Sequence, residues 1–221
     1  ADLPIKDTLE DALEIPVWLE NEANLSALAE KTFVENHKNL IHVSIHAGVG
    51  AGIILDHHLY TGLAGTAGEA GHMIVQPGGR SCPCGNHGCL EQYISEPAVL
   101  SRYRELSGRT TVSIDDLVWS YNQKEADALA VVDEFTTYLA CGINNLWNLF
   151  SPECIILNSQ LTAYLPQLLP EILQKLSARF RATCQLKLST LQDTGVLLGA
   201  ARVCISKYLG IEKLYFSGFQ P

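Results

Sequence analysis

The sequence has no apolar run of the eighteen or so residues that a membrane-spanning helix needs, and residues 1–7 lack the basic and then apolar order of a signal peptide. It is also poor in basic residues, with 15 Lys and Arg against 24 Asp and Glu and a formal net charge of −9. That balance disfavours a DNA-binding surface, which must neutralise phosphates. These absences predict a cytoplasmic protein with no membrane partner, in which these 221 residues do not themselves bind DNA.

Hydrophobic residues make up 47% of the chain, enough to bury the core of one large domain or two small ones. Segments with helical and strand periodicity alternate, which predicts an α/β protein. Glycines 48, 50 and 52 predict a turn that joins two strands in a β-hairpin, and residues 62–71 are expected to be loop. The aromatic tail, residues 215–221, is expected either to dock on a neighbouring subunit or to fray. We expect helices over residues 7–13, 25–34, 96–106, 113–121, 125–148, 165–180 and 195–209, and strands over residues 17–19, 40–45, 53–55, 73–75, 154–157 and 186–189.

Three of the seven cysteines, Cys82, Cys84 and Cys89, lie within eight residues, which indicates a metal site more than a disulfide framework. Three thiolates can converge on one tetrahedral Zn²⁺ if a fourth ligand comes from elsewhere, and both His72 and His87 qualify. The alternative is a reduced cysteine-rich loop without metal. The other cysteines stand in apolar stretches and are expected to be small core residues; they are Cys141, Cys154, Cys184 and Cys204.

The segment from Gly68 to His72, with Cys82-x-Cys84-Gly85-x-x-Gly88-Cys89-x-Glu91, resembles the zinc signature of the ROK family, which contains repressors, open reading frames and kinases. The resemblance runs from about residue 8 to about residue 205 and includes residues 16–30, the glycine hairpin and residues 148–152. It implies an actin-like, ribonuclease-H-like fold of the ATPase superfamily, with a sugar bound between two lobes. It also implies that His72, not His87, is the fourth ligand of a structural Zn²⁺ held by loop 72–89.

The same resemblance assigns sugar hydroxyls to five side chains, namely Asn21, Glu22, Glu69, His72 and Glu91. Their chemistry agrees, since carboxylates accept hydrogen bonds from paired hydroxyls and an amide both donates and accepts. Taken alone, each acid could equally be a solvated surface residue. A histidine bound to zinc through one ring nitrogen has a fixed tautomer, so the other N–H of His72 should point towards the ligand.

Three positions depart from the pattern of the kinases in this family. The kinases carry aspartate as general base where this chain has Glu22, and one added carbon moves the carboxylate by about 1.5 Å. A misplacement of about 1 Å can cost on the order of a hundredfold in rate. The kinases have Gly-Thr-Gly at His46-Ala47-Gly48, and a glycine pair at Asn158-Ser159. All three changes affect the half of the reaction that involves ATP, so no catalytic residue is expected.

The phosphate loop Asp-x-Gly-x-Thr does not occur, so we expect residues 1–221 to be a fragment: the second lobe and the end of the first lobe of a ROK-type effector domain. The expected function is the effector part of a repressor of carbohydrate metabolism, responding to a sugar or sugar phosphate. Operator DNA would be bound only through an N-terminal helix-turn-helix, by a homodimer or a higher homo-oligomer. The alternatives are an ATP-dependent ROK sugar kinase and a small zinc-stabilised interaction module.

Overall fold

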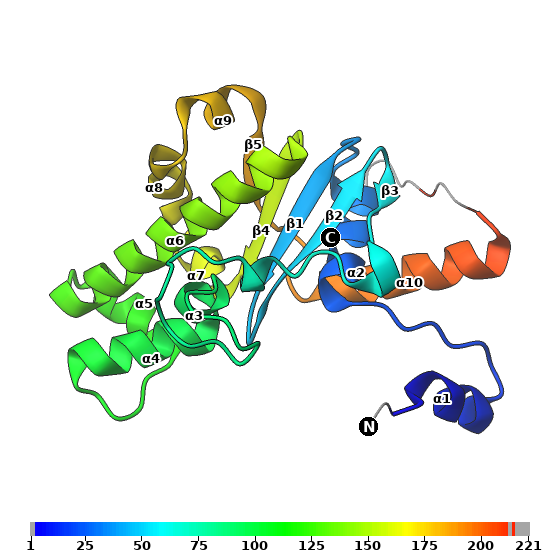
Figure 1. Cartoon of the computed structure of the whole chain (residues 1–221), viewed down its shortest axis with the longest axis horizontal. Helices are drawn as coiled ribbons and strands as arrows, with labels where there is room; N and C mark the ends of the chain where they lie inside the picture. Colours follow the sequence, from blue (N-terminus) through cyan, green and yellow to red (C-terminus); the bar gives the residue numbers. More distant parts are fainter. Residues whose placement is uncertain (1–2, 212–213, 215–221) are drawn as a thin grey trace.

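A computed structural model describes residues 3–211 and residue 214, and in it helices cover both faces of a sheet (Figure 1). The strands are β1 (Leu40–Ile45), β2 (Val49–Leu55), β3 (His58–Leu59), β4 (Cys154–Ser159) and β5 (Gln185–Leu188). The helices are α1 (Ile5–Leu13), α2 (Glu22–Ala29), the π-helix η1 (Glu30–Val34), the 3-10 helices η2 (Leu63–Gly65) and η3 (Ala70–His72), α3 (Glu91–Ile94), α4 (Glu96–Ser107), α5 (Ile114–Asn122), α6 (Ala126–Phe150), α7 (Gln160–Tyr164), α8 (Leu168–Lys175), α9 (Ala178–Thr183) and α10 (Thr194–Leu209).

The described strands form one mixed sheet in the order β3-β2-β1-β4-β5. β1 pairs with β2 and β2 with β3 in antiparallel fashion, whereas β4 is parallel to β1 and to β5. Ile45 and Ser159 are register partners at the carboxyl ends of β1 and β4, and the β1–β2 turn lies at the same edge. In open α/β sheets this edge is where ligands bind.

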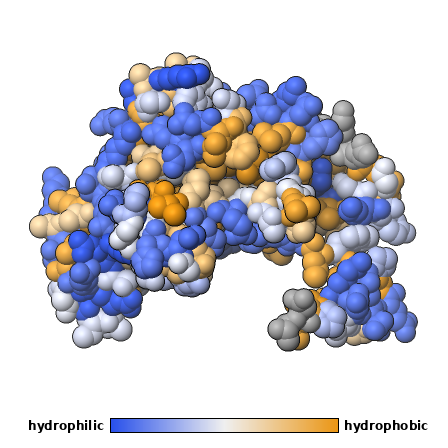
Figure 2. Space-filling view, in the orientation of Figure 1, coloured by the Kyte–Doolittle hydropathy of each residue, from blue (hydrophilic) through white to orange (hydrophobic). Residues whose placement is uncertain are grey.

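The two central strands, β1 and β4, are buried along their whole length, because helices pack on both faces of the sheet. Ile41, Val43 and Ile45 face the larger core, which α6 and the neighbouring helices complete. Leu40 faces the opposite way, into a smaller core with Ala27 of α2. α1 lies apart from the other helices, at the lower right of Figures 1 and 2, and none of its residues is buried.

Two glycines allow α2 to lie close to its neighbours. A Cβ atom at Gly52 of β2 would lie 2.2 Å from the carbonyl oxygen of Ala23, and one at Gly199 of α10 would lie 2.0 Å from that of Leu25. Any larger side chain at either position would push α2 away. α2 therefore packs directly on β2, while α10 crosses its outer side, and α2 brings its first residues to the edge where β1 ends.

Most of the expected elements are confirmed within two or three residues, and the exceptions have physical causes. Residues 17–19 form no strand, because no described strand lies beside them, and Trp18 and Leu19 are exposed. Residues 73–75 contribute only an isolated bridge between Ile74 and Cys89. The expected helix 165–180 is two helices, since the chain becomes extended at Leu176 and Ser177 starts α9 as its cap. Strand β3 and the short helices α3 and α7 were not expected.

The predicted hairpin is present, but β2 begins at Val49, so Gly50 and Gly52 lie within the strand and not in the turn. Of the four isolated cysteines, Cys154 and Cys184 are buried as expected. Cys141 is half-buried, and Cys204 is exposed on α10, which corrects the prediction for that residue. The tail, residues 215–221, lies outside the described residues. None of the described helices combines the length and the apolar character required to cross a bilayer.

Candidate functional site

The imidazole of His72 and the thiols of Cys82, Cys84 and Cys89 converge, with their ligand atoms all within 4.8 Å of one another. The Sγ atoms of Cys84 and Cys89 are 3.7 Å apart, and Nδ1 of His72 is 3.6 Å from Sγ of Cys82. A tetrahedral zinc ion with Zn–S bonds of about 2.3 Å requires sulfurs about 3.8 Å apart. The four side chains therefore fit a closed tetrahedral Zn²⁺ site with no open position.

The two candidates for the fourth ligand are distinguished by position. Among the described residues, the group that could hold a metal ion includes His72 and not His87. His87 forms a backbone bridge with Ser81 and its side chain is exposed. η3 presents His72 so that Nδ1 faces the thiols while Nε2 lies 3.9 Å from a carboxylate oxygen of Glu69.

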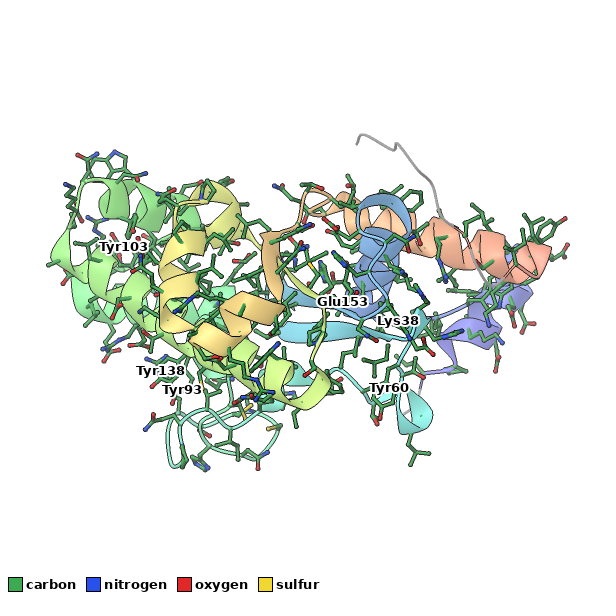
Figure 3. All side chains as sticks on the ribbon, turned by 90° about the horizontal axis from the view of Figure 1, so that it is seen from above. Lys38, Tyr60, Tyr93, Tyr103, Tyr138 and Glu153 are labelled. Atoms are coloured by element: carbon green, nitrogen blue, oxygen red, sulfur yellow. The ribbon has the colours of Figure 1, made fainter. Side chains whose placement is uncertain are left out.

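The cysteine loop is attached to α6 through aromatic and ionic contacts. The rings of Tyr93 and Tyr138 stack with centroids 4.0 Å apart. The two residues lie beside the loop (Figure 3). The guanidinium of Arg80 lies 4.5 Å above the Tyr93 ring and pairs with Glu134 of α6 at 2.5 Å. Burial raises the pKa of the Cys89 thiol to about 12, and the neighbouring thiols add to the shift. A bound cation is what would keep this thiol ionised at neutral pH.

A cavity of about 360 Å³ opens at the carboxyl edge of β1, between the start of α2, the β1–β2 turn and residues 67–69, which precede η3. Asn21, Glu22, Glu69 and Glu91 all line it, so the fold brings together four of the five residues expected to bind sugar. The fifth, His72, does not line the cavity but stands behind Glu69. The remaining lining residues are Ala23, Ser44, His46, Ala47, Gly48, Val49, Gly50, Ala51, Ala67 and Gly68.

Hydrogen bonds fix the polar groups of this cavity, which we call the first cavity. Asn21 is the N-cap of α2, and its Oδ1 accepts from the backbone N–H of Ala23 at 2.9 Å. Oε2 of Glu91 accepts from the backbone N–H of Val49 at 3.1 Å. The side chains are thus held in place before any ligand arrives, which limits the entropy lost on binding.

Glu22 is held by two hydroxyls. Its Oε1 accepts from Ser44 Oγ at 3.0 Å and from Ser26 Oγ at 3.1 Å. Sequence reasoning missed this role of Ser44. The signal for it was a serine in a mostly apolar strand that is buried throughout. A buried hydroxyl is expected to find a partner.

A second cavity of about 310 Å³ adjoins the first, at the carboxyl edges of β1 and β4. His46, Asn158 and Ser159, which replace small residues of the kinase pattern, all line this second cavity. His46 also lines the first cavity, and its Nδ1 lies 3.7 Å from Oε1 of Glu96. The remaining lining residues are Gln160, Ala163, Tyr164, Gln192 and Asp193.

The sequence model of the ROK family matches residues 1–207. The xylose repressor of Bacillus spizizenii is 34% identical over 219 residues, which cover 96% of this chain and 56% of that protein. A glucokinase of Halalkalibacterium halodurans is 32% identical over 219 residues, covering 90% of this chain and 66% of the relative. The crystal structure of a ROK family transcriptional regulator, a homologue of the E. coli MLC protein, superposes with a TM-score of 0.80 at 29% identity, over 95% of this chain and 57% of that one.

The chain therefore spans just over half the length of the xylose repressor it matches. Its relatives include both repressors and kinases. The expected fold class is confirmed: the mixed sheet with helices on both faces is the ROK fold of the actin-like ATPase superfamily. A family match over nearly the whole sequence, with the fold to accompany it, establishes that this chain belongs to the ROK family.

Proposed function

We propose that this chain is the sugar-sensing, oligomerising part of a ROK transcriptional repressor of carbohydrate metabolism, and that it does not phosphorylate sugars. One observation carries the proposal. Four of the five residues that resemble the family's sugar-binding set share the first cavity, whereas His46 and Asn158 line the adjoining cavity, where the kinases of the family have small residues. This arrangement retains the side chains that can bind sugar hydroxyls. It lacks the open backbone that nucleotide phosphates need.

The geometry of Glu22 supports the loss of catalysis. A general base must take a proton from the attacking hydroxyl, and it needs a free oxygen within hydrogen-bond reach. Two serine hydroxyls hold Oε1 of Glu22 in place, so the free oxygen is Oε2. The side chain is one carbon longer than the aspartate of the kinase pattern, which would displace that free oxygen by about 1.5 Å from the position of the base. The carboxylate can still accept a hydrogen bond from a ligand through its other oxygen. Glu22 then serves as a binding group.

Zinc, in this proposal, shapes the ligand site without touching the ligand. His72, Cys82, Cys84 and Cys89 would hold it, and a structural zinc supplies folding energy to the loop that they close. The ion would fix the tautomer of His72, whose free N–H points to the Glu69 side of the first cavity. His72 would then orient the Glu69 carboxylate from behind, and Glu69 itself would bind the sugar hydroxyls.

Sugar binding would be coupled to DNA binding in the complete protein, through lobe closure that changes the spacing between two helix-turn-helix units of a dimer. A ligand changes an equilibrium only through different affinities for the two states. Couplings of this kind are typically about 1 to 3 kcal/mol, so we expect operator affinity to change about 5- to 150-fold.

The test uses the complete protein, titrated with xylose, glucose and amino sugars while operator binding is measured. Glu69→Ala and Glu91→Ala should bind the operator normally and lose the sugar response. Glu105→Ala, on the exposed face of α4 and outside both cavities, is the matched control and should respond like the wild type. Variants at Glu69 and Glu91 that still respond to sugar would show that the effector site is elsewhere.

An ATP-dependent sugar kinase is the second candidate, favoured by the 32% identity to a glucokinase. A coupled assay with ATP and the same sugars separates the two functions. The repressor proposal expects no phosphorylation and no binding of a non-hydrolysable ATP analogue. Turnover near 1 per second, within the usual enzymatic range, would establish the kinase instead.

A further inference from the structure

The second cavity adjoins the first, because His46 lines both. Each cavity, at about 310 and 360 Å³, lies near the lower end of the range in which small organic ligands bind. A ligand bound against Glu22 and Glu91 could therefore continue past His46 into a second space of similar size.

The side chains of the second cavity suit a neutral, hydroxyl-rich group. Asn158, Gln160 and Gln192 offer amides that both donate and accept, and Ser159 adds a hydroxyl. Tyr164 of α7 is about half exposed and provides an apolar ring face beside its hydroxyl. Alternating polar groups and one flat apolar surface complement a sugar ring, which has hydroxyls at its edge and C–H groups on its faces.

The charges of the second cavity are unsuited to a phosphate. None of the described residues that line it is lysine or arginine, the side chains that hold phosphates. α4 and α10 both begin here, and a helix N-terminus attracts anions. Glu96, the first residue of α4, and Asp193, the N-cap of α10, already place carboxylates at those two ends. A phosphate would meet two like charges.

We infer that the effector is a neutral disaccharide, with one sugar unit in the first cavity and the second unit past His46 in the second cavity. This inference rests on the proposed sugar-sensing function and specifies its ligand. The first cavity would bind one sugar unit through Glu22, Glu69 and Glu91, which resemble the family's sugar-binding residues. The second cavity would favour a ligand of two sugar units over a single sugar, and it would exclude phosphorylated sugars and nucleotides.

The experiment is calorimetric titration of the complete protein with four probes: xylose, xylobiose, glucose and cellobiose. One disaccharide should bind at least about tenfold more tightly than its own monosaccharide. Tyr164→Ala and Gln160→Ala should each lower the affinity for that disaccharide to that for its monosaccharide. The affinity for the monosaccharide should stay within about twofold of the wild-type value. Glu91→Gln should weaken both ligands, and Glu105→Ala, outside both cavities, neither. Glucose 6-phosphate and a non-hydrolysable ATP analogue serve as the charged probes.

The outcomes separate this inference from the function on which it rests. If the monosaccharides bind as tightly as the disaccharides, or if Tyr164→Ala and Gln160→Ala change nothing, the two-unit ligand is refuted while sugar sensing stands. Preferential binding of glucose 6-phosphate or the ATP analogue also refutes it. If no sugar binds and Glu91→Gln is without effect on operator release, the proposed function fails as well.

Discussion

Replacing Glu30 with glutamine should make the protein more stable at pH 8 and change it far less at pH 5. Glu30 opens the π-helix η1 and is only 1% exposed, on the side of the sheet opposite to α6. Burial raises the pKa of its carboxyl from 4.5 to about 7, opposed by the hydrogen bond from Ser189 Oγ at 2.5 Å and increased by nearby Glu35. The folded protein therefore holds a proton on this group that the unfolded chain has lost at neutral pH.

The sign and size of the effect follow from the two pKa values. Below pH 4.5 both states are protonated and the group has no effect on the free energy of unfolding. As the pH rises from 4.5 to 7, only the unfolded chain loses its proton, which destabilises the fold by about 1.4 kcal/mol per pH unit. Between pH 5 and pH 8 the loss is on the order of 2 to 3 kcal/mol. Glutamine has no proton to lose, and it can still accept the hydrogen bond from Ser189.

The assay is urea unfolding of wild type and Glu30→Gln at pH 5 and pH 8, with zinc present throughout. The difference in unfolding free energy between the two proteins should become about 2 to 3 kcal/mol more favourable to the variant at pH 8. Other ionising groups, the metal-binding thiols included, are common to both proteins and cancel in that difference. Asp11→Asn, an exposed acid in α1, controls for the lost charge. An equal difference at both pH values would refute the raised pKa.

Three further predictions concern packing, metal and catalysis. Gly52→Ala should cost about 1 to 3 kcal/mol or more of stability in chemical denaturation, since its Cβ would meet a backbone oxygen, whereas Gly195→Ala, with its nearest atom at 3.6 Å, should stay within about 0.5 kcal/mol. Cys84→Ser should reduce bound zinc well below one ion per chain and expose residues 73–89 to proteolysis; full zinc occupancy would contradict the ligand set. Glu22→Asp should not gain phosphorylation in a coupled assay, because His46 and Asn158 remain.

The elements whose signals are local were predictable from the sequence. Ser113 and Asp116 form a capping box, and the helix expected over 113–121 is α5, Ile114–Asn122. The elements that depend on distant neighbours were not predictable. Residues 17–19 have the composition of a strand, but a strand exists only beside another, and no described strand is adjacent. The sequence placed Gly52 in a turn. It lies within β2 instead, where the absence of a side chain allows α2 to pack closely on the strand.

The candidate site shows the same division. The clustered cysteines indicated three candidate metal ligands by spacing alone, while the fourth candidate, His72, needed the family resemblance to separate it from His87. Sequence reasoning also grouped Asn21, Glu69 and Glu91 only through their motifs, since nothing local links residues so far apart. The hydrogen bond from Ser44 to Glu22 could not be foreseen, because it depends on the packing of α2 against β1.

The position of His46 suggests why a sensor would lose catalysis and change its ligand in a single step. The residue follows β1 at the carboxyl edge of the sheet, and its side chain lines both cavities. In the proposed sensor, a larger side chain at this point removes space and backbone access in the second cavity and, at the same time, adds a wall to the first cavity. Under the proposed function, restoring kinase activity would therefore require more than an aspartate at position 22. It would also require a small residue at position 46, and that change would alter the affinity for the effector.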